Sequence, residues 1–301
     1  MNGPMKYVIT NETKIVNGET LYHIQSLVDF KTIDGRSVKK GDYGGYVSSL
    51  NCLSQKGKSW IRSNAYVIGS RVSSNALVAG KAIVIGGKVM HNSIVKGNAK
   101  LICSETYNSA VVQDNAELNE SYVGGTSVIC GNAVVSEKSQ IFGCSRVQDN
   151  AQVTNRSYIL DGSVCDSSTL IHAHIEGYHI KGNSRVRGVH FYGQGNIVDS
   201  VIDVQGRFHL LLSCEFNKAK ITNASQFFFI TLGHWLMLDI AIYPSIEGEL
   251  LACYGAYGVR SDVVPFEEVD KSVRENRIIP EKLWDNVVAL SREFIKEKFD
   301  A

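Results

Sequence analysis

The sequence is poor in proline, with 4 prolines in 301 residues, and its 7 cysteines include no CxxC pair. So few prolines beside 27 glycines argue against a disordered or collagen-like chain. An odd number of scattered cysteines argues against a disulfide framework and against a zinc ribbon. No apolar run reaches the roughly 18 residues of a membrane span, and the N-terminus lacks a signal-peptide pattern. We therefore expect a soluble, cytoplasmic protein with reduced thiols and no membrane partner.

Charge of one sign is also lacking, because 31 Lys and Arg residues face 30 Asp and Glu residues. No run of basic residues alternates with aromatic residues, so we expect no nucleic-acid partner. The P-loop, GxGxxG, GxSxG and HExxH motifs are absent as well. No common catalytic or phosphate-binding motif therefore points to an activity.

A six-residue period runs through the middle of the chain. The aliphatic members of the series, with one cysteine among them, are Val123, Ile129, Val135, Ile141, Val147, Val153, Ile159, Cys165 and Ile171. A small residue stands two positions before each of them. This spacing fits neither the 3.6-residue period of a helix nor a hairpin meander. It predicts a mainly β fold built on a left-handed parallel β-helix, in which three hexapeptide repeats form one triangular coil.

The series continues towards the N-terminus with occasional five-residue steps, passing through Tyr107 to Val67. One corner of the coil then carries an asparagine in most turns. These asparagines are Asn64, Asn98, Asn115, Asn132 and Asn150. Asparagine tolerates the backbone of a sharp corner, and its amide can bond to the next amide in a stack, so we predict an asparagine ladder.

The two ends of the chain have a different character, which predicts three parts: an N-terminal β-hairpin and cap (1–60), the β-helix (61–220) and a small C-terminal α/β element (221–301). We expect Trp60 and Tyr46 to close the first coil. The C-terminal part is expected to contain strands at 226–232, 236–243 and 249–254 and helices at 265–273 and 280–299. The residues predicted to line one face of the last helix are Leu283, Val287, Leu290 and Phe294.

The N-terminal run contains Gly41-Asp42-Tyr43-Gly44-Gly45-Tyr46-Val47, then Asn51-Cys52-Leu53-Ser54 with Gly57, and then Trp60. It resembles the opening of a family of phage and bacterial left-handed β-helix proteins that includes the YdcK-like, acyltransferase-like proteins. The resemblance extends through the repeats to about residue 160. It implies the β-helix fold and a phage or mobile-element origin, whereas the acyltransferase activity in that family rests mainly on the fold itself.

An apolar stripe is predicted on one outer face of the coil. Residues that flank an inward position point outward, and on this face they are Tyr122, Phe142, Tyr158 and Leu160. An exposed apolar stripe of this kind indicates an interaction surface that another part of the protein or a partner buries. We assign it to a homotrimer interface, the alternative being the chain's own C-terminal element.

The candidate ligand-binding residues lie where the six-residue period fails, after Ile171. They are His172, His174, His179, Arg185, Arg187, His190, Tyr192, Arg207 and His209. Three hypotheses compete: an anion pocket between subunits, a zinc site using His174 and His179, and acyl transfer with His174 or His190 as general base. Zinc would need a third histidine about two coils earlier, and none stands there, so we expect no metal.

We therefore predict a non-catalytic, homotrimeric β-helix binding module. It would capture a small anionic ligand, such as a nucleotide signal, at subunit boundaries, or present a surface to a protein partner. No cofactor is expected. The alternative is an acyl-CoA-dependent acyltransferase of the hexapeptide-repeat class.

Overall fold

A computed structural model describes residues 5–16, 18–62, 64–210, 214–231, 238–256, 263–275 and 280–299. The chain is mainly β, with 48% strand and 11% helix, and is built on a parallel β-solenoid of about 10 turns. The predicted fold class is thereby confirmed, while the left hand of the coil stays a prediction. The chain divides into two compact units, Met1–Asp166 and Ser167–Ala301. No helix within these described ranges is long and apolar enough to cross a membrane.

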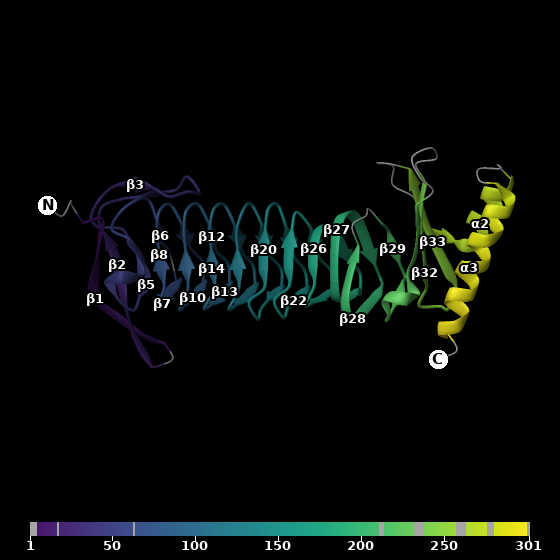
Figure 1. Cartoon of the computed structure of the whole chain (residues 1–301). Helices are drawn as coiled ribbons and strands as arrows, with labels where there is room; N and C mark the ends of the chain where they lie inside the picture. Colours follow the sequence, from purple (N-terminus) through teal and green to yellow (C-terminus); the bar gives the residue numbers. More distant parts are fainter. Residues whose placement is uncertain are drawn as a thin grey trace. The chain divides into compact units, whose positions relative to one another are not determined.

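The first unit opens with a small antiparallel sheet that contains the predicted hairpin. The N-terminal elements are β1 (Tyr7–Val16), β2 (Glu19–Ser26), β3 (Phe30–Lys31), β4 (Ser37–Val38), β5 (Tyr43–Val47) and the 3-10 turn η1 (Leu50–Cys52), of which β3 and β4 form a separate two-stranded sheet. Strand β1 pairs with β2, β2 pairs with β5, and β3 pairs with β4. Figure 1 shows the β1–β2 hairpin extending away from the stacked coils.

Trp60 is buried, but it does not fill the first coil as predicted: Ile61 is in register with the inward Val78, so Trp60, in register with Leu77, points outward. Its side chain is 1% exposed, and its ring meets Tyr7 and Phe30 edge-on, at centroid distances of 6.4 and 5.5 Å. Tyr46 points outward as well, because its neighbour Val47 is in register with the inward Val67. It is half-buried, and its ring stacks on His23 at 4.5 Å.

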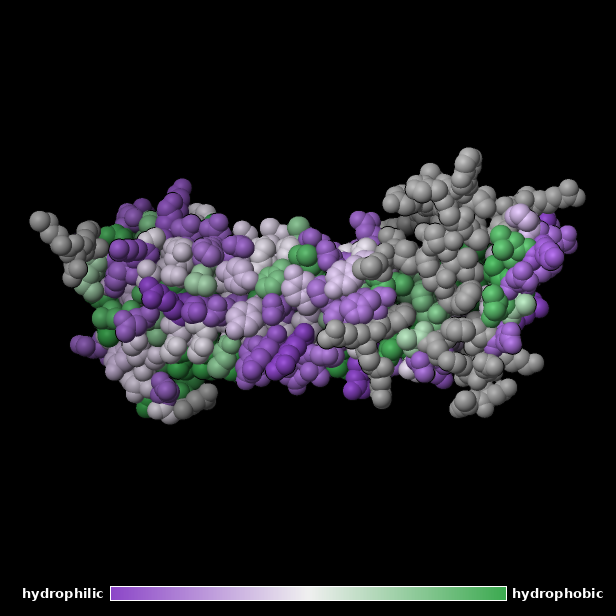
Figure 2. Space-filling model, viewed as in Figure 1, coloured by the Kyte–Doolittle hydropathy of each residue, from purple (hydrophilic) through white to green (hydrophobic). Residues whose placement is uncertain are grey.

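The coils of the first unit run through three parallel sheets. The first sheet holds β7 (Tyr66–Ile68), β10 (Ile83–Ile85), β13 (Lys100–Ile102), β16 (Glu117–Asn119), β19 (Val134–Val135) and β22 (Gln152–Thr154). The second holds β8 (Arg71–Val72), β11 (Lys88–Val89), β14 (Glu105–Thr106), β17 (Tyr122–Val123), β20 (Gln140–Phe142) and β23 (Tyr158–Leu160). The third holds β6 (Trp60–Ile61), β9 (Leu77–Val78), β12 (Ile94–Val95), β15 (Val111–Val112), β18 (Val128–Ile129), β21 (Arg146–Val147) and β24 (Ser163–Val164). The face of the coils seen in Figure 2 is mostly hydrophilic or near neutral, as expected when the aliphatic side chains point inward.

The coils are not all of one length. Val67 pairs with Val84 in the next coil, whereas Val123 pairs with Ile141, so the later coil contains one residue more than the earlier one. The longer coil is repeated between Ile141 and Ile159. A strict six-residue step therefore describes only the part of the chain where three equal steps complete a coil. Elsewhere one side of the coil takes five residues.

The predicted inward positions of Cys165 and Ile171 are wrong for this reason. Val164 and Leu170 point inward instead and are 0% exposed, while Cys165 and Ile171 are half-buried. The cause is Gly162, which takes the corner position by accepting the backbone hydrogen bond of Arg146. After Ile159, counting in sixes therefore selects the residue that follows each inward position.

Tyr107 is a second correction to the predicted core. Thr106 is the inward residue and is 0% exposed, with its hydroxyl donating to Ser93 Oγ at 3.2 Å. Tyr107 lies outside and is half-buried. A threonine can occupy the core here because its polar atom finds a partner.

The asparagine ladder is confirmed over four coils. Each amide donates to the next, from Asn98 to Asn115 at 2.8 Å, from Asn115 to Asn132 at 3.0 Å and from Asn132 to Asn150 at 3.0 Å. Asn64 stands at the same corner but outside the ladder, because Lys81 occupies the coil between it and Asn98.

The second unit is also coiled, with longer strands and a more aromatic core. Its parallel strands are β25 (Thr169–Ile171), β26 (His174–Lys181), β27 (Arg185–Val198), β28 (Val201–Leu210), β29 (Phe216–Asn217) and β30 (Lys220–Ile221). Phe191 stacks on Phe216 at 5.7 Å and lies 5.2 Å from Tyr178, and all three rings are at most 1% exposed. Parallel coils are therefore still present where the six-residue period has failed.

In the described residues the C-terminal element is an antiparallel sheet with two helices. Its elements are the 3-10 turn η2 (Ala224–Gln226), β31 (Phe228–Thr231), β32 (Leu238–Pro244), β33 (Leu250–Ala256), β34 (Val263–Pro265), α2 (Phe266–Glu275) and α3 (Glu281–Phe299). Both helices lie along one face of the sheet in Figure 1.

The buried face of α3 differs from the prediction. Trp284, Val287 and Val288 pack against Ile240 and Ile242 of the sheet, whereas Leu283 and Leu290 are 51% and 55% exposed. Trp284 decides the orientation, since it buries the largest apolar surface and its indole N–H donates to Asp270 at 2.8 Å. The side chain of Phe294 lies outside the described part of the chain.

Candidate ligand-binding site

Three of the predicted site residues form one row across adjacent coils. His174 of β26 is in register with His190 of β27, and His190 is in register with His209 of β28. Each histidine precedes an inward core residue, so all three side chains point outward from the same sheet. The row is hidden in the sequence because its members are unevenly spaced along the chain.

The rings of this row lie against one another. His174 and His190 stack with centroids 5.6 Å apart, and His190 and His209 lie 4.5 Å apart at a tilt of 40°. Tyr192 joins the row from the side, with its ring 4.8 Å from His174. His209 is exposed and the other three rings are half-buried. We call His174, His190, His209 and Tyr192 the histidine row.

The most sheltered imidazole of the histidine row is held towards its neutral form. Burial lowers the pKa of His174, the Glu176 carboxylate opposes this shift, and the neighbouring His209 adds to it. A neutral imidazole can accept a proton or a hydrogen bond. His174 therefore has the protonation state that a general base or a polar binding group needs.

Arg185 and Arg187 lie together on a different sheet of the coil and share one carboxylate. Arg185 Nε is 3.4 Å from Asp203 and Arg187 is 3.9 Å from it, and both arginine side chains are about half exposed, at 47% and 49%. Lys220, which is exposed, is in register with Val201, whose other neighbour is Arg185. Two guanidiniums share one carboxylate, which leaves net positive charge at this pair.

The remaining predicted residues lie apart from both groups. His179 is in register with Asn196, after the corner at Gly177, whereas His174 is in register with His190 before it. His172 is an exposed corner residue with φ 48°. The side chain of Arg207 lies outside the described residues.

The apolar stripe of the first unit is present as outward rings. Tyr122 is 41% exposed, and Phe142 lies 5.7 Å from Tyr158, with Leu160 in register beside Phe142. Tyr107, which the sequence placed in the core, belongs to this surface and lies 5.9 Å from Phe142. We call Tyr107, Tyr122, Phe142, Tyr158 and Leu160 the aromatic stripe.

A glycine makes the fifth member of the aromatic stripe possible. A Cβ atom on Gly124 would lie 2.5 Å from the ring of Tyr107. The ring therefore rests over the glycine of the next coil and reaches Phe142 in the coil after it. Gly124 was the sequence signal for an outward Tyr107, because a bulky outward side chain one coil away needs such a gap.

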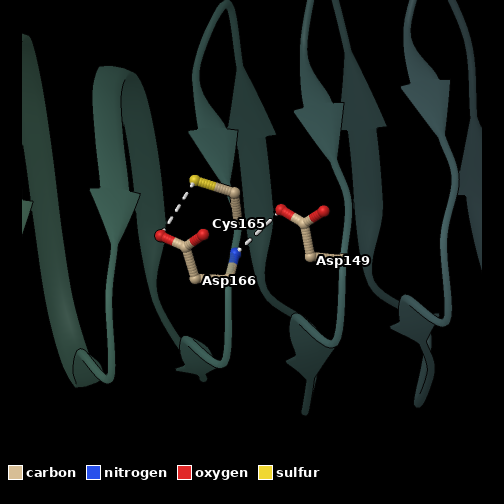
Figure 3. Close-up of side chains that lie close together, drawn as sticks. All are labelled: Asp149, Cys165 and Asp166. Carbon is tan, nitrogen blue, oxygen red and sulfur yellow. Dashed lines mark hydrogen bonds between the residues drawn. The ribbon is translucent and has the colours of Figure 1, made fainter.

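One cluster of possible metal ligands is explained by the backbone. Asp149, Cys165 and Asp166 place three donor atoms within 4.8 Å of one another (Figure 3). Asp149 Oδ2 already accepts the backbone N–H of Asp166 at 3.1 Å, just as Asp114 accepts that of Gly131 on the same corner. These aspartates have φ near +60°, so their carboxylates support tight corners of the coil.

Fold and surface together define a class of protein, a parallel β-solenoid that carries ring side chains outward on its sheets. No family model matches the sequence, and no curated protein matches it.

Proposed function

We propose that the protein is a non-catalytic binding module of the left-handed, hexapeptide-repeat type, active in the cytoplasm as a homotrimer and capturing a small anionic ligand. The observation that carries the ligand class is the pair of half-exposed guanidiniums of Arg185 and Arg187 around a single carboxylate. One carboxylate neutralises one of the two charges, and guanidinium groups bind phosphate and carboxylate through paired N–H donors. We also propose that the protein is related to the YdcK-like phage and bacterial β-helix proteins that its N-terminal run resembles.

The anion site is tested by calorimetric titration with pyrophosphate and with ATP. We expect saturable binding that Arg187→Gln weakens at least about tenfold, since a charge-assisted contact is worth roughly 1.5–3 kcal/mol. Arg156→Gln removes an exposed cation from the first unit and should leave binding unchanged. Equal loss in both variants would show that only net charge matters and would contradict a defined site.

The trimer rests on the aromatic stripe, because outward apolar rings gathered on one sheet favour a covered interface. Light scattering coupled to size-exclusion chromatography should report three chains per particle. Phe142→Glu should give monomers, because it buries a charge at the interface. Gln152→Glu adds the same charge on another sheet and should leave the trimer intact. A monomeric parent protein would refute this part of the proposal.

The second candidate is acyl transfer from acyl-CoA, favoured by the lowered pKa of His174, which suits a general base. This function predicts release of free CoA that His174→Ala or His190→Ala abolishes. Ligand recovered intact after saturable binding would exclude it.

A further inference from the structure

We propose that His190 and His209, with His174 next in the same row, form a surface chelate for a divalent transition-metal ion. All three imidazoles come from one chain. The chelate therefore requires neither a second chain nor a bound anion.

The coil fixes the spacing of these ligands. Adjacent parallel strands lie about 4.8 Å apart, and the three histidines occupy aligned positions on neighbouring strands. Their rings are held 4.5 Å apart between His190 and His209, and 5.6 Å apart between His174 and His190. Two strands of a hydrogen-bonded sheet cannot separate, so the loss of freedom on binding an ion is confined to the side-chain torsions.

Closing the chelate requires the imidazole rings to rotate towards one ion. A zinc ion takes imidazole nitrogen at about 2.0–2.1 Å, so two ligand nitrogens on one ion lie roughly 3–3.5 Å apart. Among the described residues, the histidines are not already gathered around one point, since the one gathered set is Asp149, Cys165 and Asp166. His209 is exposed and can turn towards His190, whose ring is 4.5 Å away.

The chemistry of the row selects the class of ion. Imidazole suits zinc, nickel and copper, whereas magnesium and calcium prefer oxygen ligands. Glu176 is in register with Tyr192, beside the row, and supplies a carboxylate near the bound charge. Two or three protein nitrogens leave coordination positions open to water or to an anion.

The test is a titration of the full-length protein with Ni²⁺ alone in a buffer without chelators. Calorimetry measures the affinity, and native mass spectrometry counts the ions bound per chain. We expect one ion per chain, with affinity reduced at least about tenfold in His209→Gln and further in the His190→Gln, His209→Gln double variant. The matched control is His91→Asn. His91 lies at an exposed corner of the first unit with φ 58°, where asparagine keeps both the backbone geometry and an acceptor for the Asn108 N–H.

Each outcome decides the proposal. Loss of the ion in the row variants, with retention in the His91 variant and an unchanged circular dichroism spectrum, supports it. Retention of the ion by the double variant, equal loss in the His91 variant, or no binding by the parent protein overturns it. A Ca²⁺ titration separates the chelate from general charge attraction, because a site made of imidazoles should not retain Ca²⁺.

Discussion

Single side chains bond from coil to coil in this protein, and the asparagine ladder shows how such bonds add up. Asn115 donates to Asn132 and accepts from Asn98. Asn115→Ala removes both bonds and should lower the free energy of unfolding by about 1 kcal/mol, because exposed amides regain bonds to water. Urea denaturation measures this change. Asn64→Ala, at the same corner outside the ladder, should stay within about 0.5 kcal/mol of the parent.

Lys6 is the residue whose charge state should matter most in mild alkali. It is 5% exposed, its Nζ donates to the Ser59 carbonyl at 2.8 Å, and burial lowers its pKa to about 8. At this residue the unfolded chain, with a lysine pKa of 10.5, therefore binds more protons than the native protein between about pH 8 and pH 10.5. The contribution of this residue to stability thus rises as pH rises through that window.

Tyrosines also titrate in alkali, so the effect of Lys6 is measured as the difference in unfolding free energy between the parent protein and Lys6→Met. Between pH 8 and pH 10, the parent protein should gain about 2 kcal/mol of unfolding free energy relative to Lys6→Met. Urea denaturation at several pH values measures the two curves. Parallel curves would show that the ammonium is not desolvated.

At the scale of the strand, the corrected frame of the coil predicts which of two neighbours carries stability. Leu170 is 0% exposed and Ile171 is half-buried on the same strand, β25. Leu170→Ala should cost about 3 kcal/mol, through lost burial and the cavity left behind, and Ile171→Ala about 1 kcal/mol or less. Thermal or urea denaturation of the two variants decides it. The reverse order would restore the strict six-residue frame.

The strands also show how far sequence reasoning reaches. Period and small corner residues predict the solenoid and the ladder, because both depend on positions repeated in every coil. They do not predict that Tyr107, Cys165 and Ile171 point outward, since an unrecognised five-residue step changes which residue of a strand points inward. The sequence names the members of the histidine row only within a larger set of nine candidates, for the same reason. The coils in this region differ in length, so backbone pairing and not a constant period aligns the histidines.

At the scale of the whole molecule, each coil contacts only its neighbours, so stability should vary along the stack. Middle coils have two neighbours and the first coils rest on the cap. Native-state hydrogen exchange should be slowest for the core amides of β12, β15 and β18 and faster for those of β6 and β7. Equal protection throughout Met1–Asp166 would mean that this unit opens only as one body.

The corner that carries the asparagines also sets how this fold can grow or shrink between related genes. A duplicated segment from Ala99 to Asn115 would add one full turn, with one more asparagine rung and every inward residue still inward. A duplicated strand-and-corner, a third of that length, would instead turn all following side chains to a different sheet. Insertions and deletions of one whole coil should therefore be tolerated in the repeats, and shorter ones should be confined to corners where the chain can bulge.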